Sequence, residues 1–413
     1  MQTVVNIGPL PPLEQLRSTW KELEARANAS FYISWDWIGV WVERAAAGRD
    51  LRLWSAMRDG VVVALGILVR GQRKLAGLPF CESWHLHCTG DEFGQQLWVE
   101  HNDLLVDQRH GNVRSEMLDH WSKVANRASE LHLPGLHGDG WPAQVIGRLD
   151  HTCSRRMSGA VSLDLVRQKQ FDFTAVLGAH ARRFVRRSVK EYQTLGPIAV
   201  EVADTREEAL AALERLGELH ARRWEAKGQA SLFRRDAFVE FHRTLALRSL
   251  GDKRVQFLRV RAGPHDIGVL YSFVLGDRVY VYQSGFDYGL LEKHGRPGLV
   301  THTMAIQHNA RLGFKHYDML AGESRYKATL ATEVEPMTWA VLRKPALRFR
   351  LESGLRRLKD HWAARVQKKD AEADTGGPAV PSMTDHLGSG LQESPRPALE
   401  GRSGLRAALT DPA

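Results

Sequence analysis

The stretch that decides the fold runs from Lys253 to Thr329: Lys253-RVQFLRVRAGPHDIGVLYSFVLGDRVYVYQSGFDYGLLEKHGRPGLVTHTMAIQHNARLGFKHYDMLAGESRYKA-Thr329. Gly276-Asp277 joins two of its runs as a two-residue hairpin turn, because glycine readily takes the positive φ that such a turn needs. The alternation and β-branched content of the first part predict three short strands, at residues 253–261, 267–275 and 278–286.

A glycine-rich loop and a helical pattern follow these strands. The helix is expected over 299–312, with Gly313 as its C-cap, and a strand over 315–320 comes next. A strand, a glycine-rich turn and a helix in this order suit phosphate, since the first helical turn has unpaired N–H groups at the positive end of the dipole. The alternative is that Pro297-Gly298 only begins a packed helix, and neither a Walker A nor a G-x-G-x-x-G motif is there.

The same region resembles the GNAT acyltransferase superfamily, best over about 181–327. The branch it resembles is named for CelD proteins of cellulose biosynthesis and is related to the FemABX peptidoglycan-bridge enzymes. The superfamily's phosphate loop reads Arg/Gln-x-x-Gly-x-Gly/Ala, which the chain matches loosely. The resemblance rests on Gly295-Arg-Pro-Gly298, Ala310-Arg-Leu-Gly313, Tyr317-Asp318, Gly322 and Tyr326-Lys327.

The resemblance implies an acyl-CoA co-substrate, such as acetyl-CoA. The strand before the helix would pair with the pantetheine arm, and the helix N-terminus would take the pyrophosphate. The residues to which it assigns cofactor binding are Gln283, Gly295, Arg296, Gly298, Leu299 and Lys327.

Acyl transfer to an amine needs a base, donors for the tetrahedral oxyanion and an acid for the leaving thiolate. Glu323 or Asp318 is the candidate base and Tyr326 the candidate acid, since Asp318 lies in the strand at 315–320 and the other two come just after it. For each of them the alternative is a surface salt bridge or a sheet-edge contact. No metal is expected, because on a strand His85 and His87 would face away from Cys88.

Composition bounds the class of protein. The 413 residues are 43% apolar and 25% charged, as in ordinary globular proteins. Three cysteines are typical of a reducing compartment, and no signal peptide or apolar run of about 20 residues is evident, so we expect a cytoplasmic protein. The net charge of +9 fits an anionic ligand, such as CoA phosphates, RNA, a nucleotide sugar or lipid headgroups.

The order helix, strand, turn, strand occurs twice, at 35–70 and at 237–275. This repetition predicts an α/β protein of two GNAT-like lobes, each a mixed, mostly antiparallel sheet flanked by helices. The expected divisions are an N-terminal lobe at 1–165, an acyltransferase lobe at 166–345, an amphipathic helix at 346–369 and a disordered tail at 370–413. Packing on the domain and lying on an acidic membrane surface both stay open for the amphipathic helix.

The expected function is N-acyl transfer from acyl-CoA to an amine of a polysaccharide or cell-envelope precursor. One alternative is a FemABX-like enzyme that uses aminoacyl-tRNA. Its phosphates would contact the predicted basic helix at 178–192, with Arg182, Arg186 and Lys190 at four-residue steps. The alternative for this helix is an ordinary solvated face. We favour CoA and do not expect nucleic acid as a partner. Another alternative is a non-catalytic pair of lobes that binds a polysaccharide-synthesis partner or acidic lipid.

Overall fold

The computed structural model describes residues 2–126, 129–137, 149–291, 293, 295–322, 325–352 and 354. One 13-stranded sheet runs through the whole molecule. Its strands are β1 (Thr3–Pro9), β2 (Asp50–Arg58), β3 (Val61–Leu75), β4 (Leu78–Leu86), β5 (Leu105–Val106), β6 (Ser129–His137), β7 (Asp150–Ser162), β8 (Ile198–Val202), β9 (Val255–Ala262), β10 (His265–Leu275), β11 (Arg278–Phe286), β12 (His316–Ala321) and β13 (Glu333–Arg343).

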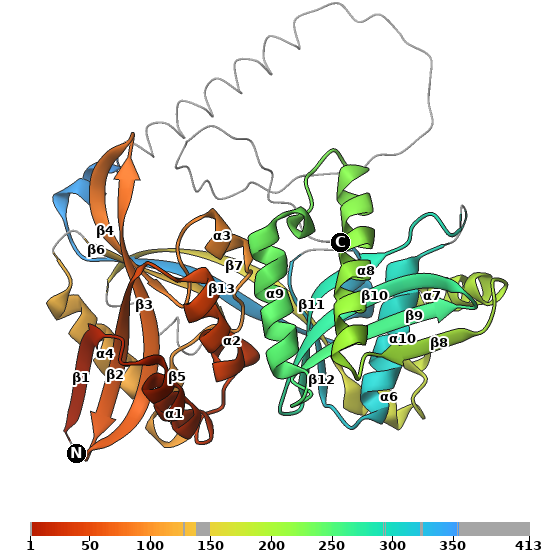
Figure 1. Cartoon of the computed structure of the whole chain (residues 1–413), viewed down its shortest axis with the longest axis horizontal. Coiled ribbons are helices and arrows are strands. Elements are labelled where there is room, and N and C mark those ends of the chain that lie inside the picture. The colour runs from red at the N-terminus through yellow and green to blue at the C-terminus, as the bar shows by residue number, and fades with distance from the viewer. Residues whose placement is uncertain are drawn as a thin grey trace, which may run out of the picture.

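The helices cover both faces of this sheet and divide between two lobes that lie side by side (Figure 1). Those of the N-terminal lobe are α1 (Leu13–Glu24), α2 (Trp35–Val40), α3 (Glu92–Gln96) and α4 (Val113–Val124). Those of the C-terminal lobe are α6 (Leu163–Gln168), α7 (Ala179–Gln193), α8 (Arg206–Glu225), α9 (Asp236–Ser249), α10 (Pro297–Arg311) and α11 (Arg325–Leu330).

The strand order shows that the two lobes share one topology. It reads β1-β2-β3-β4-β6-β13-β7-β12-β11-β10-β9-β8, so each of these strands has its counterpart at the mirrored place in the other lobe, and only the short β5, which pairs with β3, stands outside this order among the described strands. The last strand of each copy is exchanged: β13 pairs with β6 and β7 pairs with β12. The expected α/β class with mixed, mostly antiparallel sheets is confirmed.

An aromatic core joins the lobes. Phe31 stacks on Phe273 with ring centroids 4.3 Å apart, and Trp37 meets Phe241 edge-on at 5.2 Å. These residues belong to one buried cluster drawn from both halves of the chain. A boundary at 165/166 remains a prediction, but the sheet is continuous across it because β7 lies between β12 and β13.

The local patterns predicted several elements, including the hairpin at 276–277 and the helices now labelled α9 and α10. The strands β1, β7 and β8 carry no prediction. Residues 347–352 are helical, whereas the rest of the expected amphipathic helix and the tail lie outside the described residues.

Candidate active site at the splayed strands

The candidate site lies where β11 and β12 separate. The two strands run parallel, and only Arg278, Val279 and Tyr280 of β11 pair with β12. Beyond Tyr280, β11 continues to Phe286 without a partner strand on this side in the described part of the chain. A bulge on the other side, where β10 shifts register opposite 281–283, bends β11 at the same point. The strands therefore open into a wedge that exposes backbone hydrogen-bonding groups.

The wedge holds a narrow cavity of about 30 Å³, enough for a water-sized group. Side chains and backbone of β11, β12, α11 and one loop of the N-terminal lobe meet there. Its lining includes three residues expected from the sequence, Gln283, Tyr326 and Lys327. The other members are Trp98, Glu100, Val281, Tyr282, Ser284, Met319, Leu320 and Ala321.

Glu100 is the titratable carboxyl of this cavity, and it comes from the N-terminal lobe. Its Oε2 accepts a hydrogen bond from the Ala321 N–H at 2.7 Å. Burial raises the pKa of Glu100 to about 7, although this N–H and the charge of Lys327 act in the opposite direction. A carboxyl with a pKa near neutrality is suited to take a proton from an amine. No motif in the sequence signals it, because the residue enters the cavity from a remote loop.

Two polar groups flank Glu100. Lys327 is buried, and its Nζ donates to the Ala321 carbonyl at 2.8 Å. Gln283 is also buried, and its Oε1 has no hydrogen-bond donor within the described residues. A buried acceptor without a donor is uncommon, and here it lines a cavity. The site thus offers a cation and a free amide oxygen beside a titratable carboxyl.

The Tyr326 ring is held in place by α10. It stacks on His302 with centroids 4.8 Å apart and planes 12° apart. His302 in turn shares a 2.7 Å hydrogen bond between its Nδ1 and the Tyr317 hydroxyl. Burial lowers the pKa of His302 to about 3, so the imidazole is neutral. This stack fixes the ring while the residue lines the cavity.

The N-terminus of α10 lies one turn before His302, about 6 Å along the helix axis. Arg296 is its N-cap residue and is exposed, with its guanidinium 3.9 Å from the centroid of Phe184 on α7. Gly298 and Leu299 are buried. A Cβ on Gly298 would lie 3.3 Å from the Phe286 ring, and one on Gly295 would lie 2.7 Å from Leu291. Both glycines therefore permit close packing within the protein, and their role toward a ligand stays a prediction.

Asp318 occupies a structural junction. Its carboxylate is 2.7 Å from Arg278 Nη1 and 2.9 Å from His101 Nε2, and it accepts the Leu320 N–H at 2.8 Å. Burial alone would raise the pKa of Asp318, but these partners hold it well below its ordinary value. Asp318 is thus a fixed anion, which makes it a poor proton acceptor. Glu323 lies outside the described residues.

The basic side chains predicted at four-residue steps on α7 partly serve to hold the segment around Thr174 in place. Arg182 Nε donates to the Thr174 carbonyl at 3.0 Å, and Arg186 Nε donates to the Thr174 hydroxyl at 3.0 Å. Arg183 is exposed, and its guanidinium lies 5.7 Å from the Phe184 ring that Arg296 also covers. Arg183 and Arg296 therefore place two guanidinium groups around Phe184, beside the start of α10.

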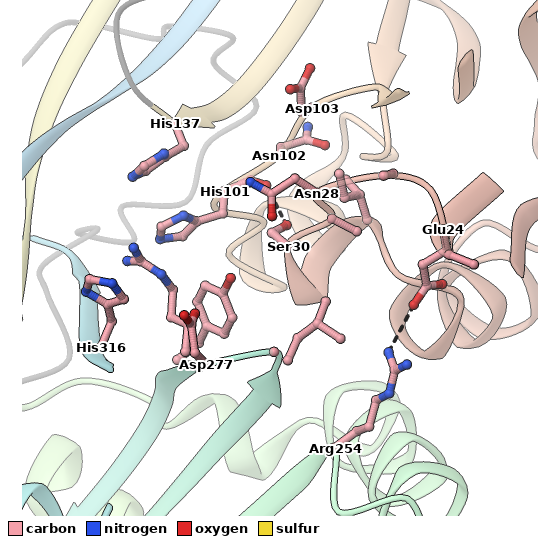
Figure 2. Close-up of a pocket in the computed structure, with 18 of the residues that line it drawn as sticks. Glu24, Asn28, Ser30, His101, Asn102, Asp103, His137, Arg254, Asp277 and His316 are labelled. Carbon is pink, nitrogen blue, oxygen red and sulfur yellow. Dashed lines mark hydrogen bonds and ion pairs between the residues drawn. The ribbon is translucent and has the colours of Figure 1, made fainter. Parts of the chain in front are cut away.

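A second, larger hollow of about 730 Å³ lies between the lobes. It meets the other end of the β11–β12 pair, at Arg278 and His316. Figure 2 shows three imidazoles, His101, His137 and His316, gathered on one side of it, with the Glu24–Arg254 ion pair opposite. Because Glu100 and His101 are consecutive, one loop lines both cavities.

Among the residues with described positions, no group of histidine, cysteine and acidic side chains is arranged to hold a metal ion. His87 instead shares a hydrogen bond with Asn102 and accepts one from the Ile67 N–H. Over the same part of the chain, no helix combines the length and apolarity needed to cross a membrane.

Comparisons with known proteins agree with this geometry. Residues 179–328 match the family described as acetyltransferase (GNAT) domain. The match covers the region of α7, the wedge, α10 and most of α11, so the C-terminal lobe has a GNAT-type acyltransferase fold. No curated protein sequence matches the chain.

Among solved structures, FemX superposes with a TM-score of 0.53 at 12% identity, covering 82% of this chain and 97% of FemX. This likeness shows a shared fold. L-PGS from Bacillus licheniformis has a TM-score of 0.49 at 11% identity, covering 83% of this chain and 95% of that one. A tandem GNAT protein from the clavulanic acid pathway has a TM-score of 0.43 at 12% identity, covering 83% and 99%.

Proposed function

We propose that the protein transfers an acyl group from acyl-CoA to an amine of a polysaccharide or cell-envelope precursor, with the wedge between β11 and β12 as the reaction centre. The observation that carries the proposal is the buried Glu100, poised near neutrality at the point where the strands separate. The family match of the C-terminal lobe supports the same class of reaction.

The roles follow from the lining of the wedge. Glu100 takes a proton from the acceptor ammonium, and the freed amine nitrogen attacks the acyl carbonyl carbon. A C–N bond forms and the C–S bond breaks, and Tyr326 gives its hydroxyl proton to the leaving thiolate. The second proton that the nitrogen loses as it becomes an amide restores the tyrosine hydroxyl, and the proton on Glu100 leaves to solvent. Unpaired N–H groups of β11 are the candidate donors to the tetrahedral oxyanion. The oxygen of Gln283 is free to accept a hydrogen bond from a bound amide or ammonium.

The donor's phosphates belong at the start of α10, next to Arg296 and Arg183. The acceptor belongs in the hollow between the lobes, which is large and polar enough for a hydrogen-bonding precursor. An aminoacyl-tRNA donor is the second candidate, favoured by the likeness of fold to FemX.

The test is a donor panel. Calorimetry with purified protein should give binding of at least one acyl-CoA, and mass spectrometry should then find acylated product among a panel of amino sugars and amino acids. Glu100→Gln is the matched variant, since it should bind the same donor without turnover. Turnover with aminoacyl-tRNA only would show that the second candidate is the donor. Binding of an acyl-CoA without any product would favour a non-catalytic role.

A further inference from the structure

The tip of the β3–β4 hairpin and the helix at 347–352 packed beside it carry exposed leucines. The β3–β4 hairpin presents Leu75 and Leu78, which face each other across the turn and are 40% and 71% exposed. Residues 347–352 form a short helix whose Leu347 and Leu351, one turn apart, are 76% and 69% exposed. Exposed leucines gathered in one place commonly mark an interaction surface.

The hairpin and the helix form one unit although about 270 residues separate them in sequence. Phe349 on the inner side of the helix is buried and meets Phe80 edge-on at 5.8 Å. Arg73 of β3 donates to both oxygens of Glu352 at 3.0 and 2.9 Å, and Arg348 donates to the Phe80 carbonyl. Figure 1 shows the blue C-terminal segment beside β4 at this end. The inner face holds the helix in place, so the outward leucines are a fixed feature.

Cations accompany these leucines. Lys74 stands next to Leu75 and Arg350 next to Leu351, and both side chains are exposed without an ion pair in the part of the chain that the structure describes. The acidic Glu352 is occupied by Arg73. The sequence beyond continues the alternation with Leu355, Arg356, Arg357, Leu358 and Lys359. Leucines that protrude among unpaired cations suit a surface with an apolar interior and anionic headgroups.

We propose that the β3–β4 hairpin tip and the helix at 347–352 form a docking surface for an anionic membrane leaflet. The leucines would enter the acyl boundary, and Lys74 and Arg350 would contact lipid phosphates. The proposal is independent of the acyl-transfer chemistry, and it fits a protein whose acceptor is a lipid-linked or membrane-proximal precursor.

The test is sedimentation of the full chain with vesicles. Vesicles of three parts phosphatidylcholine to one part phosphatidylglycerol should bind the protein, and pure phosphatidylcholine should bind it at least tenfold more weakly. Replacing Leu78, Leu347 and Leu351 by serine should lower binding at least tenfold without changing the melting curve, because these side chains are exposed. Lys74→Gln with Arg350→Gln should lower it severalfold and weaken its salt dependence.

Leu312→Ser is the matched control, since Leu312 is 56% exposed at the far end of α10 and should leave vesicle binding unchanged. Equal binding to both kinds of vesicle, or no binding at all, would overturn the proposal. So would full binding by the triple leucine variant, which would assign the membrane contact to another segment, such as 355–413. Loss of self-association in that variant without any vesicle binding would show that a second copy covers the leucines instead.

Discussion

Each lobe contains an equivalent pair of parallel strands, and the two pairs differ in whether the space beyond their paired residues is open or filled. In the C-terminal lobe β11 and β12 separate after three residues and leave a cavity. In the N-terminal lobe the equivalent strands β4 and β6 pair over 82–85 and 129–132, and the space beyond is filled by the chain itself. The N-terminal lobe thus lacks an open wedge at the described positions because a segment of its own occupies that place.

The segment that fills the N-terminal wedge is 99–102. Asn102 pairs with β6 through its N–H to the Gly135 carbonyl at 2.9 Å, and its side-chain amide donates to the Leu86 carbonyl of β4 at 3.1 Å. Gly135 takes φ of +63°, and a Cβ there would lie 2.3 Å from the Val99 carbonyl oxygen. Only glycine permits this approach. The same segment carries Glu100, which lines the wedge of the other lobe. The segment that fills the N-terminal wedge therefore also supplies a side chain to the C-terminal one.

Removing the base should have the largest effect on activity. Glu100→Gln keeps the shape of the side chain and an oxygen for the Ala321 N–H, but it removes the proton acceptor. We expect kcat to fall by about 10²–10⁴-fold with donor affinity little changed. Glu92→Gln, a substitution at an exposed site nearby, is the control. Wild-type turnover by Glu100→Gln would reduce Glu100 to a packing residue.

The pKa of Glu100 gives two pH signatures. Activity should rise with pH through a value near 7 as the carboxyl ionises, and burial is the cause of that value. Because the folded pKa exceeds the unfolded one, the folded state holds the extra proton between about pH 4.5 and 7, so stability falls as pH rises through this window. Relative to Glu100→Gln, the wild type should lose up to about 3 kcal/mol of unfolding free energy. Parallel curves of stability against pH in denaturant titrations would contradict this.

A substitution that loosens segment 99–102 should lower both the stability of the protein and its activity. Asn102→Ala leaves the Leu86 carbonyl and the His87 ring without their buried partner. We expect the free energy of unfolding to fall by about 2–4 kcal/mol, since each unsatisfied buried group costs about 1–3 kcal/mol. The kcat should fall at least about tenfold because Glu100 loses its position. Asn112→Ala, at an exposed site, is the control. A loss of stability in Asn102→Ala without any change in kcat would show that segment 99–102 fills the wedge but does not position Glu100 for catalysis.

Tyr326→Phe should have a smaller effect on rate. The stack on His302 stays, and only the hydroxyl is lost. We expect kcat to fall at least roughly tenfold with donor binding unchanged, as when a transition-state interaction is removed. Steady-state kinetics with isothermal calorimetry measures both. If the variant turns over at the parental rate, water or another side chain protonates the thiolate.

The smallest effect concerns the start of the helix that lies between the two parallel strands of each lobe in the chain, α10 in one lobe and α4 in the other. Arg183→Gln with Arg296→Gln should weaken acyl-CoA binding about three- to tenfold and reduce its salt dependence. The equivalent region of α4 has no such role, so Asn112→Ala should leave binding unchanged. A steep salt dependence of tRNA binding, lost in the double variant, would instead favour the aminoacyl-tRNA donor.

The sequence predicted those elements whose structure is determined by residues close together in the chain, and it missed those that depend on distant contacts. The hairpin at 276–277 and helix α10 follow from turn residues and periodicity. Gln283, Tyr326 and Lys327, named from the sequence as candidate site residues, line one cavity, and their roles stay predictions. The strand β7 was missed because its first residues, Asp150–Met157, show no apolar alternation. Pairing with β13 over residues 150–160 holds it in the sheet.

By itself, the sequence determined the strands, turns and helices whose apolar faces repeat at a fixed period, and with them the GNAT-like order of the C-terminal lobe. Only the tertiary structure decided where the proposed base, Glu100, lies. Glu100 stands in a polar stretch far from the wedge in sequence, and its pKa comes from burial against β12 rather than from its neighbours along the chain. The pKa of such a group is set only in the folded protein, where segment 99–102 of one lobe is buried against the other lobe.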